Sequence, residues 1–298
     1  LLCGAFYQRK GRSRDPKSII NEIHLLEKKG FKEVTLLGQN VDSYLWYGGG
    51  LKKDYSKASL LQKKTSLRFN NLLEIIAKEK PKMRIRFSTS NPQDMSDEVI
   101  EVISKYPNIC KHIHLPVQSG SNKILKKMNR QHTREEYLDL ITKIKNKIPD
   151  CSISHDIITG FPSENNEDHL DTLNLMESVK YEYGYMFKYS ERPGTLAQKK
   201  FIDNVPTEIK NIRLNEIIFK QKNHSYYRNQ LFLNKIVCVL IEKESKKSNE
   251  FWSGRTTQNT VVVFPKKNFS LGDFVDVKIE NCTNATLIGN GLRISKDI

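Results

Sequence analysis

The chain has 298 residues, 38% apolar and 28% charged, which is enough to bury a core in one large and one smaller domain and excludes wholesale disorder. No apolar run approaches the roughly 18 residues that span a bilayer, and five scattered cysteines argue against a secreted disulfide framework, so we expect a cytoplasmic protein without a membrane partner. The formal charge of +15 favours nucleic acid as the partner.

From about Asp15 to Tyr189, the chain alternates short β-branched runs with stretches of helical period. Asp15 and Pro16 are typical of a helix start, Ser96 begins a second predicted helix, and Thr133 with Glu136 forms a capping box for a third. The predicted strands are residues 34–37, 85–87, 113–115, 153–158 and 185–189. Strands that alternate with helices form parallel βα units, so the sequence predicts an α/β sheet or barrel.

Two further segments complete the plan of the chain. Residues 48–66 are polar and rich in glycine, which predicts an inserted loop with no role in the sheet. After a predicted helix at 206–228, five short runs at 236–241, 251–256, 260–264, 274–279 and 286–294 predict a small antiparallel β-barrel of the OB type. We therefore expect two domains, residues 1–229 and 230–298.

Small and polar residues follow four consecutive predicted strands, at 38–40, 88–90, 116–121 and 156–162. In a parallel barrel the functional residues gather in the loops at the carboxyl ends of the strands. Ordinary turn chemistry explains any one of these loops. Four in succession predict a shared binding rim.

Several of these segments resemble the radical-SAM methylthiotransferases. They are LLGQNVDSY at 36–44, FSTSNP at 87–92, HIHLPVQSGS at 112–121 and KYSERPGT at 188–195. The runs SGRT at 253–256 and VVVFP at 261–265 resemble the RNA-binding TRAM module of that family. The resemblance implies a partial (β/α)6 radical-SAM barrel, here lacking its first strand, followed by a TRAM barrel.

The resemblance also implies an activity. Such enzymes use S-adenosylmethionine, a 4Fe–4S cluster and a low-potential electron donor to add a 2-methylthio group to isopentenyladenosine beside the tRNA anticodon. A monomer that binds the anticodon stem-loop is expected. Relatives that act on threonylcarbamoyl-adenosine in tRNA or on a ribosomal protein remain alternatives, and a non-catalytic tRNA-binding protein is an alternative of another class.

The resemblance further implies contacts with S-adenosylmethionine. Gly38 and its neighbours would receive the methionine amino group, and Gly160 and Phe161 would lie near the adenine. Gln118, Arg130 and Asp156 would hold the carboxylate and ribose, although a turn cap, a solvated helix end and a structural hydrogen bond are the respective alternatives. The complete expected set is Gly38, Gln39, Ser88, Gln118, Ser119, Arg130, Asp156, Gly160 and Phe161.

Two other groups of residues are candidates for function. Arg255 on a predicted strand beside Trp252 suits a base or phosphate contact, with a solvated barrel surface as the alternative. His112 and His114 share a strand but have no further ligand at metal spacing, so we interpret them as ordinary strand residues.

The chain departs from the family pattern at its amino end. The family carries Cys-x-x-x-Cys-x-x-Cys just before residues 13–16, whereas this chain has only Cys3 nearby, and one thiolate cannot replace three. Cys110, Cys151, Cys238 and Cys282 fall in or beside predicted helices and strands and do not supply the missing ligands. We therefore expect an amino-terminally truncated, inactive fragment, with a frameshift near Gly11 and the missing motif encoded upstream. A smaller departure is Ser163, where relatives usually have Gly.

Overall fold

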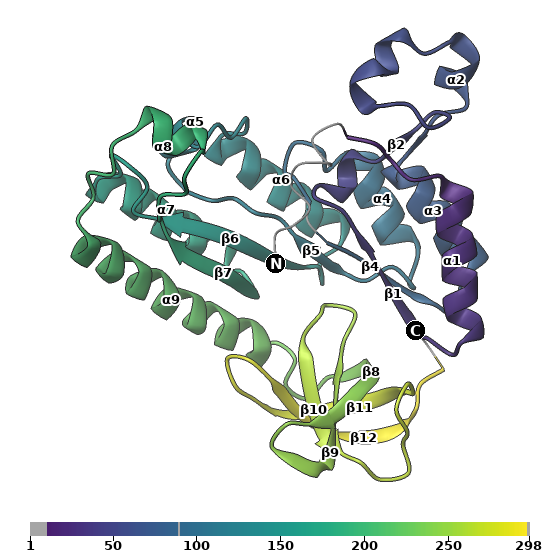
Figure 1. The fold of residues 1–298 in the computed structure, drawn as a ribbon. Helices are drawn as coiled ribbons and strands as arrows, with labels where there is room; N and C mark the ends of the chain where they lie inside the picture. Colours follow the sequence, from purple (N-terminus) through teal and green to yellow (C-terminus); the bar gives the residue numbers. More distant parts are fainter. Residues whose placement is uncertain (1–10, 89, 297–298) are drawn as a thin grey trace. The chain divides into compact units, whose positions relative to one another are not determined.

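The computed structural model describes residues 11–88 and 90–296 (Figure 1). The chain forms two compact units that divide between Cys110 and Lys111. This division lies within the α/β part of the chain, whereas the two-domain boundary expected at residue 230 rests on the sequence and stays a prediction. Each unit is described by itself.

The first unit is built on two parallel strands and three helices. Strand β1 (Glu33–Leu37) pairs with β4 (Arg84–Ser88), in a register that sets Glu33 opposite Arg84 and Leu37 opposite Ser88. Helix α1 (Pro16–Lys28) precedes β1, α3 (Phe69–Glu79) precedes β4, and α4 (Asp97–Lys105) follows it. Asp15 caps α1 through a bond from the Lys17 backbone N–H, as its position predicts. The core includes Phe69, Leu73, Ile76, Ile85 and Ile103.

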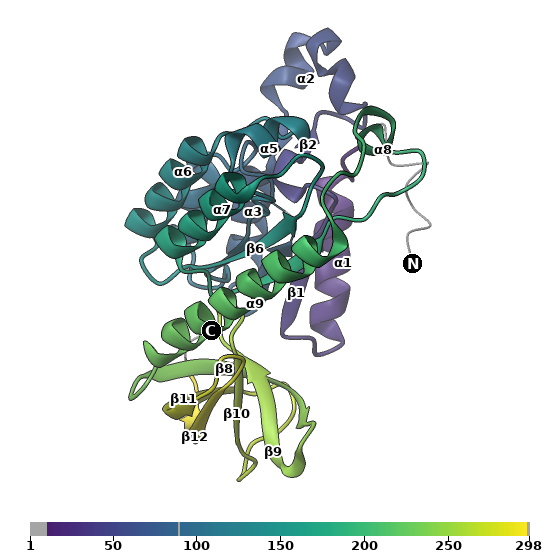
Figure 2. The ribbon, with the colours of Figure 1, turned by 90° about the vertical axis from the view of Figure 1, so that its left-hand side faces the viewer.

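A projecting segment interrupts the first unit, and we call residues 45–68 the arm. Its stalk is a short antiparallel pair, β2 (Leu45–Trp46) and β3 (Leu67–Arg68). The 3-10 helices η1 (Val41–Ser43) and η2 (Lys52–Lys57) and the helix α2 (Leu60–Lys64) lie before and within it. Residues 48–66 carry no strand, as expected, yet they hold two helical segments and are not a plain loop. Figures 1 and 2 both show the arm projecting from the rest of its unit.

The second unit begins with a three-stranded parallel sheet in the order β5 (His112–His114), β6 (Ser152–Thr159) and β7 (Tyr183–Lys188). The capping box predicted at Thr133 and Glu136 is present at the start of α6. The long helix α9 packs along β7 and against α7 (Figure 2). The helices are α5 (Asn122–Lys127), α6 (Arg134–Lys147), α7 (Asn166–Val179), α8 (Leu196–Lys200) and α9 (Thr207–Gln230).

The second unit ends in a closed five-stranded barrel. Its strands are β8 (Ile236–Ser245), β9 (Ser248–Arg255), β10 (Val261–Pro265), β11 (Phe274–Cys282) and β12 (Leu287–Ile294). The barrel order is β10-β12-β11-β8-β9. Four pairings are antiparallel, and β10 and β12 close the barrel in parallel. The expected small β-barrel is confirmed, with this one parallel pair as a difference. Strand β11 lies between the two in the chain, which leaves enough length for a parallel crossover.

Hydrogen bonds join this barrel to the α/β part of the same unit. The β9–β10 turn supplies Gln258, whose Nε2 lies 2.8 Å from Oδ2 of Asp150, and Asn259, whose Nδ2 lies 2.8 Å from the Tyr183 hydroxyl. At the start of β6, the Ser152 hydroxyl donates to the Gln258 carbonyl at 2.6 Å. The barrel is therefore attached to the amino ends of β6 and β7. Among the helices of the described residues, none has the length and apolar character needed to cross a membrane.

Candidate cofactor and RNA sites

Three expected cofactor residues lie at one edge of the first unit. Gly38 and Gln39 come directly after β1, and Ser88 is the last residue of β4. Because β1 and β4 are parallel and pair Leu37 with Ser88, the three residues share the carboxyl edge of this sheet. A Cβ added to Gly38 would meet Val41 at 3.5 Å, an ordinary contact, so folding does not require glycine there.

A cavity of about 1110 Å³ borders this edge. Its walls come from α1 and the whole of β1, from residues 38–41, from the segment 11–14 and from Leu51 and Lys52 of the arm. The segment is fixed in place by the Lys52 N–H, which donates to the Gly11 carbonyl at 2.9 Å, and by the Ser13 hydroxyl, which accepts from the Leu45 N–H at 2.9 Å. The cavity is thus a built feature of the first unit.

Asp42 is a buried carboxylic acid at the same edge, which sequence reasoning did not single out. It is 7% exposed, and its Oδ1 accepts a hydrogen bond from the Ser90 hydroxyl at 3.1 Å. Within the described residues its Oδ2 has no partner. Burial raises the pKa of Asp42 to about 7, only partly opposed by the Ser90 bond. The sequence signal that could have identified Asp42 is its position in the segment 36–44, one of those that resemble the family.

The second unit brings Gln118, Arg130 and Asp156 together. The Gln118 backbone forms a bridge with β6, donating to the Asp156 carbonyl and accepting from the Ile158 N–H, both at 2.9 Å. Its φ of 74° is left-handed, a strained conformation typical of functional positions. The Arg130 side chain remains partly exposed. Partial burial of its guanidinium lowers the pKa of Arg130, and the negative charge of Asp156 opposes this shift. This geometry suits a site for a zwitterionic ligand.

The two strand histidines are hydrogen-bonded within the sheet. The Ser154 hydroxyl lies 2.9 Å from both His112 Nε2 and His114 Nδ1. His114 Nε2 lies 3.4 Å from Oδ1 of Asp156, and the Tyr183 hydroxyl lies 2.8 Å from His112 Nε2. These contacts agree with the interpretation of both histidines as strand residues. His114 also contacts the Asp156 carboxylate and so limits its orientation.

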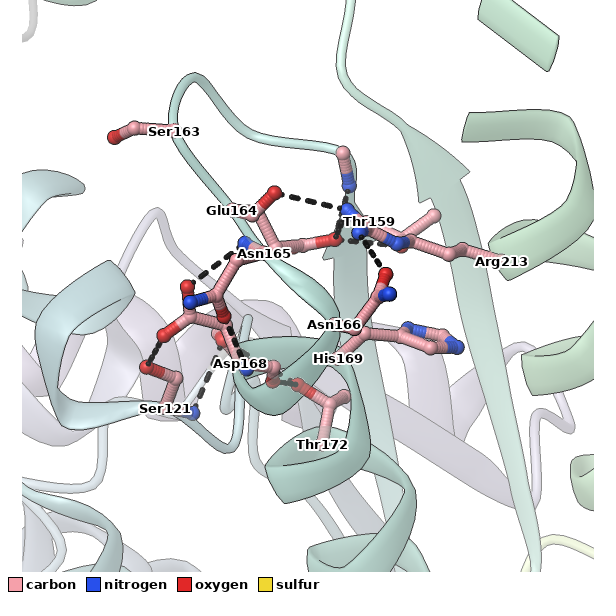
Figure 3. Close-up of polar contacts among 12 residues, drawn as sticks. Ser121, Thr159, Ser163, Glu164, Asn165, Asn166, Asp168, His169, Thr172 and Arg213 are labelled. Atoms are coloured by element: carbon pink, nitrogen blue, oxygen red, sulfur yellow. Dashed lines mark hydrogen bonds and ion pairs between the residues drawn. The ribbon is translucent and has the colours of Figure 1, made fainter. Parts of the chain in front are cut away.

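A buried ion pair holds the loop after β6 (Figure 3). Oε1 of Glu164 accepts from the Gly160 N–H at 2.9 Å, and from Arg213 Nη1 of α9 at 2.9 Å. The other guanidinium nitrogen of Arg213 donates to Oδ1 of Asn166 at 2.9 Å. Both charged side chains are at most 6% exposed. The position of Gly160 and Phe161 therefore depends on Glu164 and Arg213, which lie far apart in the sequence, and sequence reasoning identified neither.

A second part of the same network holds the loop that carries Ser119 (Figure 3). The Ser121 hydroxyl donates to Oδ1 of Asp168 at 2.7 Å, and the Gly120 N–H donates to the Thr172 hydroxyl at 3.0 Å. Asp168 also closes the capping box of α7 with Asn165, through two bonds of 2.9 Å. Helix α7 thus anchors the loops after both β5 and β6.

The loop after β6 has two positions where the chain takes a left-handed conformation. Gly160 has a φ of 70°, and a Cβ there would lie 2.4 Å from Cγ of Lys210, so only glycine fits without movement. Ser163 has a φ of 65°, a conformation that glycine adopts without strain. Phe161 is 4% exposed and packs on Tyr189 with ring centroids 5.0 Å apart. Its expected contact with adenine stays a prediction.

Arg255 and Trp252 lie on opposite faces of β9. The pairing of β9 with β10 is regular from Arg255 to Phe251, so alternate residues point to alternate sides. Trp252 packs against the barrel core and donates its Nε1–H to the Phe269 carbonyl at 3.0 Å. Arg255 lies 3.7 Å from Glu242 with 42% of its side chain exposed. Arg255 and the partly buried Trp252 therefore face different sides of the strand, and their expected RNA contacts stay predictions.

The cysteines that the structure describes do not form a cluster site. Cys3 lies outside the described residues. Cys110, Cys151 and Cys282 are buried, and burial raises the pKa of the Cys151 and Cys282 thiols, which disfavours the thiolate that binds metal. The part of the chain that the structure describes contains no group of three His, Cys, Asp or Glu placed to hold a metal ion. These donors do not fit a 4Fe–4S cluster.

Comparison with known proteins identifies both parts of the chain. Residues 3–176 match the family model described as the Radical SAM superfamily, and residues 230–291 match the TRAM domain. Among solved structures, coproporphyrinogen III oxidase of Escherichia coli overlays with a TM-score of 0.44 at 13% identity, over 95% of this chain and 67% of that one. The assignment therefore rests on the sequence matches.

Curated relatives match nearly the whole chain. Proteins named tRNA-2-methylthio-N(6)-dimethylallyladenosine synthase are 61% identical in Christiangramia forsetii and 60% identical in Flavobacterium johnsoniae, each over 97% of this chain and 60% of the relative. The protein of that name in Karelsulcia muelleri is 59% identical, over 96% of this chain and 63% of its own length. The chain thus spans about 60% of the length of the curated relatives it matches.

Proposed function

This chain belongs to the Radical SAM superfamily, and on that premise we propose that it is part of a tRNA methylthiotransferase. The reaction adds a 2-methylthio group to dimethylallyladenosine, also called isopentenyladenosine, in tRNA. Identity of 61% over 97% of the chain to a synthase of that name is the observation that carries the proposal. The TRAM match at 230–291 and the formal charge of +15 support an RNA substrate.

We propose that the expected residues of each unit contact S-adenosylmethionine, as the family resemblance implies. Arg130 is suited to the methionine carboxylate because a guanidinium donates two parallel hydrogen bonds to it. Asp156 accepts from the ribose hydroxyls, and His114 limits the orientation of its carboxylate. Gly38, Gln39 and Ser88 offer backbone and hydroxyl groups to the amino group, while the Glu164–Arg213 pair fixes the loop of Gly160 and Phe161. Gln118 and Ser119 complete the proposed set.

The lack of a fitting set of cluster ligands among the described residues limits what this chain can do alone. Because the described donors do not fit a 4Fe–4S cluster, we propose that the 298 residues alone bind tRNA without turnover. The second candidate, a non-catalytic tRNA-binding protein, is favoured by this same observation. The anticodon stem-loop as the bound element, an electron donor for the complete enzyme, a monomeric state and a cytoplasmic location belong to the proposal.

Nucleoside analysis tests the proposed reaction. tRNA from the source strain is compared with tRNA from a strain in which the gene is deleted, with methylthio-threonylcarbamoyladenosine measured as the internal control. If the chain acts as part of the complete enzyme on the proposed substrate, deletion lowers the ratio of 2-methylthio-isopentenyladenosine to isopentenyladenosine and leaves the control nucleoside constant. An unchanged ratio, with tRNA binding by the purified chain, assigns it to the non-catalytic class. A change in the control nucleoside alone assigns the other tRNA substrate.

A further inference from the structure

The arm concentrates positive charge in a small part of the chain. Residues 45–68 contain six basic residues and one acidic residue, Asp54, so this short segment carries +5 of the net +15. The barrel residues 231–298 carry 10 basic and 7 acidic residues, a net of only +3. The arm is therefore the stronger candidate for a surface that binds a polyanion.

Contacts between its own residues hold the arm in a defined conformation. The Tyr47 ring is 6% exposed and packs edge-on against Tyr55, with centroids 5.2 Å apart. A Cβ on Gly50 would lie 2.2 Å from the Tyr47 hydroxyl oxygen, so the turn closes tightly over the ring. Ser59 and Gln62 form a reciprocal capping box on α2. A preformed surface loses less conformational entropy when it binds a partner.

Three of its lysines are available for such a partner. Lys53, Lys57 and Lys64 are exposed, and none of them is paired with a carboxylate among the residues that the structure describes. Lys52 and Lys63 have structural contacts, with Asp94 at 4.0 Å and with the Ser56 carbonyl at 2.9 Å. The first three can thus be exchanged without removing a contact that holds the arm together.

The arm leaves the first unit at the edge where the candidate cofactor residues lie. Strand β1 ends at Leu37, Gly38 and Gln39 follow, and η1 leads directly into the stalk. Leu51 and Lys52 of the arm line the cavity at this edge. A polyanion held by the arm would therefore lie beside the edge of the sheet at which chemistry takes place in parallel α/β folds.

We propose that the arm binds the phosphate backbone of the tRNA substrate through Lys53, Lys57 and Lys64. This inference rests on the proposed function and adds to it an RNA-binding surface outside the TRAM domain. Leu60 and Leu61, 87% and 70% exposed on α2, provide apolar surface between these lysines for ribose or base contacts. A protein partner would also suit two leucines, but a net charge of +5 in so short a segment favours the nucleic acid.

The test compares three forms of the full 298-residue chain with the wild type. The arm variant carries Lys53→Gln, Lys57→Gln and Lys64→Gln. The control carries Lys28→Gln, Lys29→Gln and Lys32→Gln, which removes the same charge from exposed lysines near the amino end of β1. A third form replaces the arm lysines with Arg. Binding of a tRNA anticodon stem-loop is measured by fluorescence anisotropy over a range of salt concentrations, and circular dichroism checks the fold.

We expect the arm variant to bind at least about fivefold more weakly at about 0.1 M salt, and its slope of log affinity against log salt to fall by about 2 to 3. The Arg form and the control should keep most of the wild-type affinity. Equal weakening of arm variant and control overturns the proposal, since it reflects net charge alone. An arm variant that binds like wild type also overturns it and leaves the proposed function intact. A wild-type chain that binds no RNA contradicts both.

Discussion

Asp42 is the residue through which pH should most directly change the stability of the first unit. Its pKa is raised to about 7 by burial, against 3.8 for the exposed group. The native state therefore keeps a proton that the unfolded chain releases between about pH 4 and 7. Because the folded state binds more protons in this window, the free energy of unfolding falls as the pH rises through it, by up to about 4 kcal/mol.

We expect Asp42→Asn to remove this dependence. The amide resembles the protonated acid and still accepts from Ser90, so the variant should be more stable than wild type by about 2 kcal/mol at pH 5 and by about 4 kcal/mol at pH 8. Thermal unfolding followed by tryptophan fluorescence at both pH values checks this. Burial lowers the pKa of His155 to about 4 and gives an opposite slope in both proteins, so the difference between them isolates Asp42. A difference that does not grow with pH contradicts the argument.

Ser163 offers a test of backbone strain in the loop after β6. Its φ of 65° costs a residue with a Cβ about 1 kcal/mol, which glycine avoids. We expect Ser163→Gly to stabilise the second unit by about 0.5 kcal/mol, since the added freedom of the unfolded chain offsets part of the gain. Ser163→Ala is the control, because it removes the hydroxyl and keeps the strain. Urea unfolding in which the Ala variant is the more stable would exclude the strain explanation.

At the scale of the elements, the pair Glu164–Arg213 joins the loop after β6 to α9. The two side chains are at most 6% exposed, and Glu164 also accepts from the Gly160 N–H. A buried charge that loses its partner is far less stable than a pair. We expect Arg213→Met to lower the free energy of unfolding by about 3 to 5 kcal/mol, and the double variant with Glu164→Gln to recover part of that loss.

The matched control for this prediction is Arg293→Met in the barrel. Arg293 forms an ion pair with Asp276 at 2.8 Å, but 74% of its side chain is exposed. Solvent screens such a pair, so its loss should cost less than about 1 kcal/mol. Urea unfolding of these variants and the wild type gives the comparison. Equal costs at Arg213 and Arg293 would mean that burial does not strengthen the dependence on the partner.

Elements with a local signal could be predicted from the sequence. The apolar run 153–158 lies within β6, and the capping box at Thr133 begins α6 as expected. Helix α3 was missed although Leu72, Leu73 and Ile76 have helical spacing, because it begins directly after the insertion. The stalk of the arm was also missed, since two pairs of residues give no periodicity.

The candidate site also contains residues whose placement could be predicted from the sequence and residues whose placement could not. The positions of Gln118 beyond one predicted strand and of Asp156 within the next follow from the sequence, and the structure brings them together. Glu164 and Arg213 could not be paired from sequence, because their contact depends on how α9 packs along the sheet. The orientation of Trp252 depends on the register of β9, and a shift of one residue would reverse it.

At the scale of the whole molecule, the proposed function assigns RNA binding to this chain but not the chemistry of a 4Fe–4S cluster. The chain has five cysteines. Of the four described ones, Cys110 and Cys151 lie just before β5 and β6, Cys238 lies in β8 and Cys282 ends β11, and three of them are buried. A 4Fe–4S cluster in this superfamily needs three thiolates side by side. The arm and the barrel, in contrast, provide the charged surfaces proposed for RNA.

We therefore expect the purified chain to retain far fewer than four irons after anaerobic reconstitution with iron and sulfide followed by gel filtration. Cys3→Ala should leave that small amount unchanged, because a lone thiolate holds no cluster. Cys238→Ala, a change at a half-buried cysteine, controls for iron bound non-specifically. Iron and sulfide analysis with visible absorbance gives the measurement. About four irons per chain, lost in Cys3→Ala and kept in Cys238→Ala, would mean that Cys3 belongs to a true cluster site.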